Sequence, residues 1–291
     1  MDKKFQKNVL LKDHTTFKIG GPAKYFFIAK TKEELTCAVN AGQKNKVPIL
    51  ILGGGSNLLV SDKGFKGLVI QLKISDIEFK GNKILVGAGF GLTKLAYLSA
   101  EQGLSGLEWA AGIPGTIGGA VYGNAQAFGD KISDAVEKVG ILDLKTLKTK
   151  ILPRKKCQFS LKNSIFKKNK NLIITSVFLK LRKGNKKEVQ KKIKEHLNYR
   201  KKNHPINFPS AGSVFINFED KKEIVRAGYL IEQCGLKGKR IGNAQISEKH
   251  ANFIINLGGA KATDVLKMIK VAKAEVRRKF KINLKTEIQI I

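Results

Sequence analysis

Short apolar runs alternate with an amphipathic segment in the first quarter of the chain, a pattern that predicts a small α/β unit. Strands are expected at residues 24–29, 49–52 and 64–72. Between the first two, Thr31-Lys-Glu-Glu34 matches a capping box, in which a threonine and a glutamate satisfy unpaired amides at the start of a helix. The predicted helix turns Leu35 and Ala38 inwards and ends near residues 44–46.

Residues 74–184 repeat the alternation and predict a second α/β unit after one that ends near residue 73. Its strands are expected at residues 77–79, 83–86, 136–142, 148–152 and 172–181. The pair Gly81-Asn82 predicts a hairpin between the first two of them. A helix is expected at 93–102, whereas residues 112–129 show neither the strand nor the helix period and predict a loop.

A lysine-rich amphipathic helix at residues 185–202 marks a change of pattern, so the chain is expected to divide near residue 195. The C-terminal part predicts a loop at 205–213, strands at 214–217, 252–255 and 283–291, and helices at 227–234 and 263–280. In the last strand Leu284 and Ile288 alternate with charged and polar residues, which assigns Glu287 to the polar face.

Three consecutive glycines, Gly53 to Gly55, follow the apolar run at residues 49–52. Consecutive glycines suit a loop that needs positive φ or a close approach of another group. Backbone amides along such a turn can form an anion-binding nest, to which Ser56 and Asn57 add side-chain donors. Taken alone, the same residues are also compatible with a plain turn between strands.

Residues 112–129 contain six glycines and Asn124. Long ordered loops are usually functional, and this one would let the backbone wrap around a flat or phosphorylated ligand; a tight corner between packed elements is the alternative. A third glycine group, Gly87 to Gly91, follows a strand, but its third glycine comes one residue too early for a dinucleotide fingerprint.

The formal net charge of +32 raises the question of nucleic-acid binding. The seven arginines are outnumbered by lysines that are scattered along the whole chain, and no zinc-finger spacing or arginine-rich segment is present. A lysine-rich nucleic-acid binder remains an alternative, although nucleic-acid readers favour clustered arginine. Attraction of small phosphorylated ligands is equally compatible with the charge.

Three widely spaced cysteines indicate a reducing, cytoplasmic setting without a disulfide framework. The four histidines show no metal-ligand spacing, so no metal is expected. No apolar stretch approaches the roughly 18 residues that span a bilayer, and no membrane association is expected.

Six motifs, in order and at their spacing, resemble one family, the UDP-N-acetylenolpyruvoylglucosamine reductases, also called UDP-N-acetylmuramate dehydrogenases. The resemblance extends from Asn8 to Glu287. The motifs are His14-Thr-Thr-Phe-Lys-Ile-Gly-Gly21, Leu52-Gly-Gly-Gly-Ser-Asn-Leu-Leu-Val60, Gly112-Ile-Pro-Gly-Thr-Ile-Gly-Gly-Ala120, Pro209-Ser-Ala-Gly-Ser-Val-Phe215, Ala227-Gly-Tyr-Leu-Ile-Glu-Gln-Cys-Gly-Leu-Lys-Gly238 and Lys249-His-Ala-Asn-Phe-Ile-Ile-Asn256.

The resemblance implies an α+β protein with a vanillyl-alcohol-oxidase-like FAD-binding region at residues 1–195 and a substrate-binding domain at 196–291. Non-covalent FAD would receive its diphosphate on the amides of one segment and its flavin along another, with Arg200 facing the cofactor. The residues implied are Gly53, Gly54, Gly55, Ser56 and Asn57 for the first segment, and Gly112, Ile113, Pro114, Gly115, Gly118, Gly119 and Asn124 for the second.

The implied reaction reduces UDP-N-acetylglucosamine enolpyruvate with NADPH through FAD, as a step of peptidoglycan precursor synthesis. Ser213 takes the place of the family's proton donor, and Glu287 matches a glutamate that stabilises the charged intermediate. Asn217 and Lys237 match contacts to the substrate diphosphate.

Lys162 stands where the family usually has an arginine, because Leu161-Lys-Asn-Ser164 replaces Tyr-Arg-x-Ser. Lysine keeps the charge but loses the planar, bidentate fork. Activity is therefore expected to survive in weakened form, unless Arg154, Lys155 or Lys156 supplies the charge instead. Gln289, at a position where the family has a flavin-side arginine, is a second departure.

The short span between Lys162 and Arg200 resembles the subtype that lacks a substrate-closing insertion. A monomer is expected. A flavin oxidase of the same fold and an inactive relative are the alternatives within the fold, in addition to the nucleic-acid binder.

Overall fold

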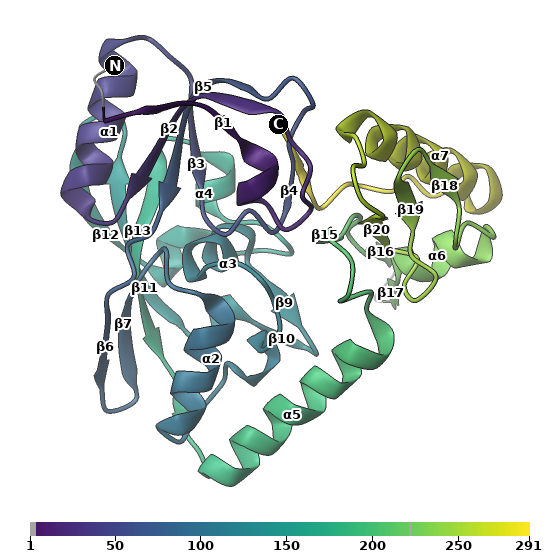
Figure 1. Ribbon diagram of the computed structural model, residues 1–291. Coiled ribbons are helices and arrows are strands. Elements are labelled where there is room, and N and C mark those ends of the chain that lie inside the picture. Colours follow the sequence, from purple (N-terminus) through teal and green to yellow (C-terminus); the bar gives the residue numbers. More distant parts are fainter. Residues whose placement is uncertain (1–3, 221–222) are drawn as a thin grey trace. The chain divides into compact units, whose positions relative to one another are not determined.

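The computed structural model describes residues 4–220 and 223–291 and contains two compact units (Figure 1). Unit 1 comprises the residues up to Lys7, Tyr25–Gly54 and Lys66–Asn198, and unit 2 comprises Asn8–Lys24, Gly55–Phe65 and Tyr199–Ile291. The division falls within helix α5 (Lys186–Asn203). Each unit has its own hydrophobic core. The C-terminal unit therefore incorporates two segments from the first quarter of the chain.

Unit 1 is built on two sheets. The four-stranded sheet, which lies mainly in this unit, has the order β1 (Gln6–Leu10), β2 (Pro22–Ala29), β5 (Phe65–Leu72) and β3 (Ile49–Leu52), with β3 parallel to β5. The antiparallel five-stranded sheet has the order β12 (Lys148–Pro153), β11 (Val136–Asp143), β13 (Leu172–Lys180), β7 (Lys83–Gly87) and β6 (Ile77–Lys80). Central strand β13 is apolar and buried almost throughout, whereas edge strand β6 alternates between half-buried and exposed residues.

The helices of unit 1 begin where the sequence offers a cap or a glycine. They are α1 (Lys32–Lys44), α2 (Leu92–Glu101), α3 (Ile117–Gly123), α4 (Ile165–Lys168) and most of α5, with 3-10 turns at Glu108–Ala110, Ile132–Asp134 and Arg154–Cys157. The Thr31 hydroxyl accepts a hydrogen bond from the Glu34 amide at 3.1 Å, and the Glu34 carboxylate accepts one from the Lys30 amide at 2.6 Å. The predicted cap is thus confirmed, although the carboxylate reaches one residue further back than in the standard box.

The prediction of a loop at residues 112–129 is wrong in its central part. Helix α3 and the hairpin β9 (Gln126–Ala127) to β10 (Asp130–Lys131) lie there. Thr116 caps the helix by accepting a hydrogen bond from the Gly119 amide, and a Cβ at Gly118 would lie 2.8 Å from the Ala88 Cβ. Close packing of Gly118 against Ala88, which directly follows β7, therefore favours the helix in this segment. This packing outweighs the low helix propensity of glycine.

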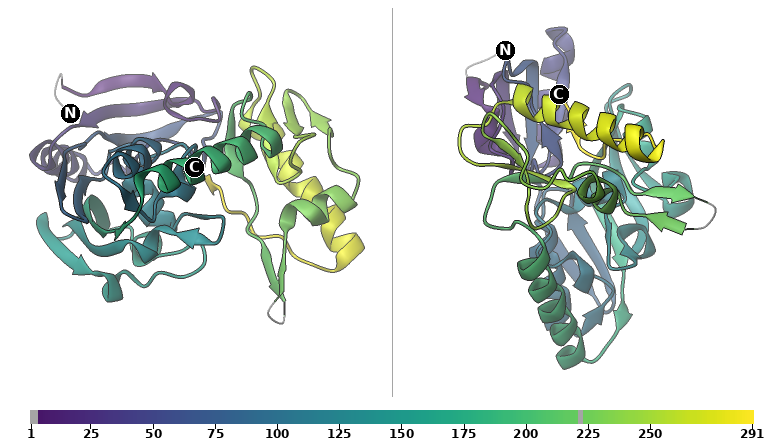
Figure 2. Two further views of the ribbon diagram at one scale, coloured as in Figure 1. Left: turned by 90° about the horizontal axis from the view of Figure 1, so that it is seen from below. Right: turned by 90° about the vertical axis from the view of Figure 1, so that its right-hand side faces the viewer.

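Unit 2 consists of a small antiparallel sheet with two helices, of which α7 runs along the sheet (Figure 2). The sheet has the order β15 (Ser210–Ser213), β20 (Phe253–Asn256), β19 (Ala244–Ile246) and β18 (Arg240–Ile241), and the helices are α6 (Ala227–Gln233) and α7 (Ala262–Phe280). The short strand β21 (Gln289–Ile290) pairs in parallel with β4 (Leu58–Leu59), and β16 (Phe218–Asp220) pairs with β17 (Glu223–Val225).

Two predicted strands of unit 2 are wrong in extent. The strand expected at 214–217 is β15 at Ser210–Ser213, and the strand expected at 283–291 shrinks to Gln289–Ile290 with an isolated bridge between Phe215 and Thr286. Residues 214–216 change partner along their length, because the Val214 amide donates to the Asn252 carbonyl and the Ile216 amide to the Lys285 carbonyl. No continuous ladder can form from such alternating partners.

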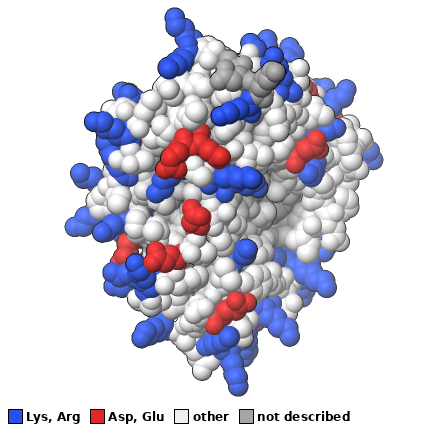
Figure 3. All heavy atoms as spheres, turned by 60° about the vertical axis from the view of Figure 1, so that its left-hand side comes forward, with Lys and Arg blue, Asp and Glu red and all other residues white. Residues whose placement is uncertain are grey.

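Lysine and arginine side chains are dispersed over the face shown in Figure 3, separated by uncharged surface and by small acidic groups. The charge on this face is not gathered into one stripe. Within the described parts of the chain, no helix is both long enough and apolar enough to cross a bilayer.

Candidate functional site

The two glycine segments of the sequence lie against each other in unit 1. A Cβ at Gly54 would be 2.7 Å from the Gly115 Cα, and a Cβ at Gly53 would be 2.7 Å from the Thr116 hydroxyl oxygen. Both distances are too short for a side chain, so the glycines are required by this close approach. Strand β3 delivers the first segment, and the turn before α3 delivers the second.

Several amides of these segments have no hydrogen-bond acceptor among residues 4–220 and 223–291. They belong to Gly54, Gly55, Ser56 and Asn57 in the first segment, and to Gly115 and Thr116 in the second. The following amides are satisfied, because Ile117 donates to the Phe90 carbonyl and Gly118 to the Ala88 carbonyl, both at 2.9 Å. Consecutive unpaired amides of this kind can bind an anion, and the diphosphate of a cofactor remains the predicted ligand.

Asn124 ends α3 in the left-handed conformation, with φ of 45°, and is 2% exposed. Its side-chain amide donates to the Ser160 carbonyl at 2.9 Å, and its side-chain oxygen accepts from the Ser133 amide at 3.3 Å. The structure thus shows Asn124 joining two loops to the end of the helix. Its contact with a flavin remains a prediction.

Lys162 lies in a two-residue turn closed by Ser160 and Asn163, whose amides and carbonyls bond to each other at 3.1 Å. Its φ is 52°, in the left-handed region that favours glycine. The turn is attached to α3, because the Ser164 hydroxyl donates to the Tyr122 carbonyl at 2.7 Å. Of the alternative cations, Arg154 already donates from its Nε to the Ser133 carbonyl at 2.7 Å.

Ser213 and Glu287 are brought together in unit 2. Ser213 ends β15, and the Glu287 amide donates to the carbonyl of the next residue, Val214, at 2.7 Å. Asn57 belongs to the same group, since its side-chain amide donates to the Glu287 carbonyl at 3.3 Å and its own carbonyl accepts from the Gln289 amide at 2.9 Å. Two predicted catalytic residues and one predicted cofactor residue therefore lie on adjacent segments.

Thr16 also belongs to this group, although nothing in its motif distinguishes it from its neighbours. Its hydroxyl donates to the Ser210 carbonyl at 2.8 Å, and its amide donates to the Gly55 carbonyl at 3.2 Å. Gly55 has φ of 64°, and a Cβ there would lie 2.2 Å from the His14 carbonyl oxygen. The motif at residues 14–21 thus supports both the glycine loop and the start of β15.

The remaining predicted residues have local partners in unit 2. Arg200 is half-buried on α5, and burial lowers the pKa of its guanidinium. The Asn217 side chain accepts from the Ala227 amide at the start of α6 at 3.2 Å. The Lys237 ammonium pairs with the Glu232 carboxylate at 2.6 Å. The roles predicted for these three residues remain predictions.

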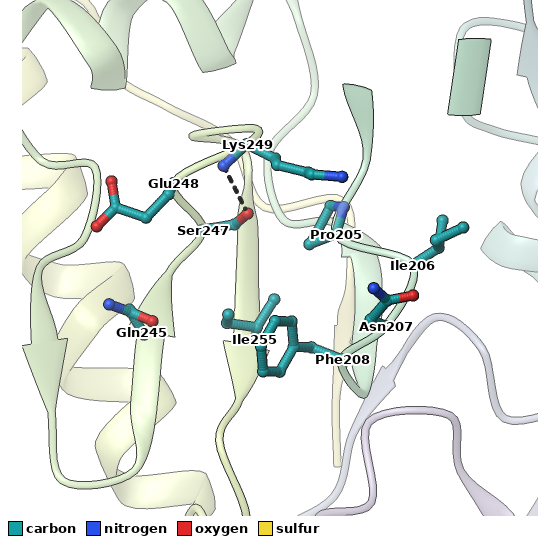
Figure 4. A pocket seen from close by; sticks show the side chains of 9 residues that line it. All are labelled: Pro205, Ile206, Asn207, Phe208, Gln245, Ser247, Glu248, Lys249 and Ile255. Carbon is teal, nitrogen blue, oxygen red and sulfur yellow. Dashed lines mark hydrogen bonds between the residues drawn. The ribbon is translucent and has the colours of Figure 1, made fainter. Parts of the chain in front are cut away.

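None of these residues lines a small pocket of about 190 Å³ in unit 2 (Figure 4). The aromatic ring of Phe208 lies beside Ile255, and Ser247 and Lys249 stand above them. The volume is below the roughly 300 Å³ at which small-molecule sites begin, so this pocket does not accommodate a dinucleotide. Within the described residues, no group of three or more histidine, cysteine or acidic side chains is arranged to hold a metal ion.

Comparison with known proteins gives consistent matches. Residues 204–291 match the family described as UDP-N-acetylenolpyruvoylglucosamine reductase, C-terminal domain, and residues 23–146 match the family described as FAD binding domain. The UDP-N-acetylenolpyruvoylglucosamine reductase of Halalkalibacterium halodurans is 42% identical and that of Bacillus subtilis 39% identical, each over 286 residues that cover 98% of this chain and 93% of the relative. The crystal structure of UDP-N-acetylenolpyruvylglucosamine reductase (MurB) from Thermus caldophilus superposes with a TM-score of 0.82 at 36% identity, covering 98% of this chain and 99% of that one.

Proposed function

Because the chain belongs to the UDP-N-acetylenolpyruvoylglucosamine reductase family, we propose that it reduces UDP-N-acetylglucosamine enolpyruvate to UDP-N-acetylmuramate with NADPH, through bound FAD. The predicted family, fold class, cofactor and enzyme class are confirmed by the matches. The structural observation that carries the proposal is the meeting of the two glycine segments, whose unpaired amides suit the diphosphate of FAD.

Bound FAD supplies the transfer of a hydride from NADPH to the substrate. The chain's own contribution begins with holding the cofactor. The amides of Gly54 to Asn57 and those of Gly115 and Thr116 would hold the diphosphate. The absence of side chains at Gly53 and Gly54 allows their close approach to Thr116 and Gly115. Arg200, half-buried on α5, would supply the positive charge that the family resemblance assigns to the cofactor.

The substrate double bond takes up one hydride and one proton. When hydride arrives at the β-carbon of the enolpyruvyl group, negative charge develops at the α-carbon and its carboxylate, and fixed donors or positive charge stabilise it. The Ser213 hydroxyl delivers the proton to the α-carbon. A serine is a weak acid in water, but the strongly basic carbon that it protonates makes the transfer favourable.

Glu287 and Lys162 assist this step in the proposed mechanism. Glu287 is fixed next to the Ser213 segment by its backbone bond to Val214 and interacts with the developing charge. Lys162 supplies a positive charge from its turn, in place of the family's arginine. Asn217 and Lys237 contact the diphosphate of the substrate. The protein acts as a monomer in the cytoplasm, in keeping with its three unpaired cysteines.

The test is the spectrum of the purified holoprotein in the two half-reactions. A yellow protein should bleach on anaerobic addition of NADPH and recover its colour on addition of the enolpyruvyl nucleotide-sugar, with formation of the lactyl ether. Recovery with oxygen and release of hydrogen peroxide, but no recovery with the nucleotide-sugar, would identify an oxidase instead. A colourless protein that takes up no FAD, and that binds nucleic acid with steep salt dependence, would refute the proposal.

A further inference from the structure

Asn252, the residue before β20, makes an unusual set of bonds to the segment that follows Ser213. Its side chain is buried, with 4% of the residue exposed. Its side-chain oxygen accepts from the Phe215 amide and its side-chain nitrogen donates to the Phe215 carbonyl, both at 2.9 Å. Its backbone carbonyl accepts from the Val214 amide at 2.8 Å. One residue therefore fixes both Val214 and Phe215.

The carboxamide bonds the backbone just past the end of the pairing between β15 and β20. Strands β15 and β20 pair at Ser210 with Ile255 and at Ser213 with Phe253, with an irregular register between these pairs. No pairing between these strands continues beyond Ser213, and there the Asn252 side chain bonds both backbone groups of Phe215. A carboxamide can do this because it carries one donor and one acceptor in the geometry of a peptide group.

The segment fixed by Asn252 also holds Glu287. The Val214 carbonyl accepts the Glu287 amide at 2.7 Å, and Phe215 forms the isolated bridge with Thr286. On the other side, Asn252 is itself supported by His250, whose Nδ1 accepts from the Asn252 amide at 3.2 Å. Asn252 thus lies between a supporting turn and the two predicted catalytic residues.

We propose that Asn252 is a positioning residue, which sets the place of the Ser213 hydroxyl and, through Val214, of Glu287 for proton delivery. This inference rests on the proposed function. Asn252 touches neither reacting atoms nor cofactor in this mechanism and acts only through the backbone of residues 213–216. Proton delivery belongs to the second half-reaction, so a displaced Ser213 slows reoxidation by the substrate and leaves reduction by NADPH unchanged.

Asn256, the last residue of β20, offers a matched control. It is 3% exposed, its side-chain nitrogen donates to the Phe17 carbonyl at 3.0 Å, and its side-chain oxygen accepts from the amides of Gly258 and Ala260. Asn256→Leu therefore removes a buried carboxamide with four bonds to backbone groups, none of which involves residues 213–216. Both half-reactions should keep their rates in this variant, whereas its thermal stability should fall.

The experiment compares anaerobic stopped-flow rates of the holoenzymes carrying Asn252→Asp, Asn252→Leu and Asn256→Leu. Asn252→Asp is nearly isosteric but places an oxygen against the Phe215 carbonyl, and Asn252→Leu leaves both Phe215 groups without a partner. Reoxidation by the enolpyruvyl nucleotide-sugar should slow about a hundredfold in both, as for a misplacement of about 1 Å. Reduction by NADPH should stay within about twofold.

The double variant Ser213→Ala with Asn252→Asp adds a second criterion. If Asn252 acts through Ser213, the double variant should lose less in the rate of reoxidation than the two single losses combined. Equal slowing in Asn256→Leu, unchanged reoxidation in folded Asn252 variants, or failure of even Asn252→Asp to fold would each overturn the assignment. A wild-type enzyme that bleaches with NADPH but never recovers with the nucleotide-sugar would instead overturn the proposed function itself.

Discussion

Gly54→Ala tests whether the contact between the two glycine segments forms the cofactor site. The new Cβ would lie 2.7 Å from the Gly115 Cα, 3.2 Å from its carbonyl carbon and 3.5 Å from its nitrogen. All three are backbone atoms, so no side-chain rotation can relieve the overlap, and the turn before α3 must move. Such overpacking costs about 1–3 kcal/mol. Because the displaced turn carries the unpaired amides of Gly115 and Thr116, much of this cost falls on FAD binding.

The affinity for FAD should therefore fall by about 5- to 150-fold, measured by titrating the apoprotein with FAD and following flavin fluorescence. Gly123→Ala is the matched control, because a Cβ there meets nothing within 4 Å and the residue ends α3, the helix that follows the Gly115 turn. This control should bind FAD as the wild type does. A Gly54→Ala protein with wild-type affinity would refute the assignment of the diphosphate to these segments.

Three further outcomes are expected. Ser213→Ala should keep its rate of reduction by NADPH and lose about 10²- to 10⁴-fold in the rate of reoxidation by the nucleotide-sugar; a parallel loss of both rates would exclude Ser213 as the proton donor. Lys162→Ala should slow reoxidation by about 10²-fold. Lys162→Arg should make reoxidation faster than in the wild type, because the guanidinium restores the bidentate fork. If neither variant changes the rate, another cation, not Lys162, supplies the charge. Burial, with nearby His250 and Arg200, lowers the pKa of His204 from 6.5 to about 4, so between these values the unfolded chain binds a proton that the folded chain does not. The contribution of His204 to the free energy of unfolding is therefore fully present above pH 6.5. It falls as the pH drops towards 4, by about 1–2 kcal/mol after allowance for solvent screening. Urea midpoints at both pH values should show this loss in the wild type and a smaller one in His204→Gln.

Local signals in the sequence are sufficient for elements whose stability is local. The hairpin around Gly81-Asn82 appears as strands β6 and β7, and the helix begun by Thr31 appears with its threonine cap. In each case the residues that decide the conformation are neighbours along the chain. Turn preferences and capping bonds then agree with the tertiary structure.

Elements whose conformation depends on contacts between distant residues could not be predicted from the pattern of apolar and polar positions. Helix α3 depends on the packing of Gly118 against Ala88, and the path of residues 214–216 depends on Asn252 and Lys285. The spacing of apolar residues along the chain contains no information about such contacts. The same limit applies to the candidate site, because the approach of Gly54 to Gly115 joins segments about sixty residues apart, and only the resemblance to a family suggested that both serve one ligand.

The pairing of β4 with β21 has a consequence for how the protein acquires its structure. Leu58 and Leu59 find their strand partners only at Gln289 and Ile290, and the Ser61 amide donates to the Ile291 carbonyl at 2.6 Å. Contacts between residues so far apart in sequence raise the contact order and slow folding. During synthesis, the segments at Asn8–Lys24 and Gly55–Phe65 must wait for nearly the whole chain before unit 2 can close. During that interval their apolar residues, such as Phe17 and Leu59, lack their partners in the core of unit 2. Apolar surface that is exposed in this way favours aggregation, so chaperones are expected to bind the nascent chain.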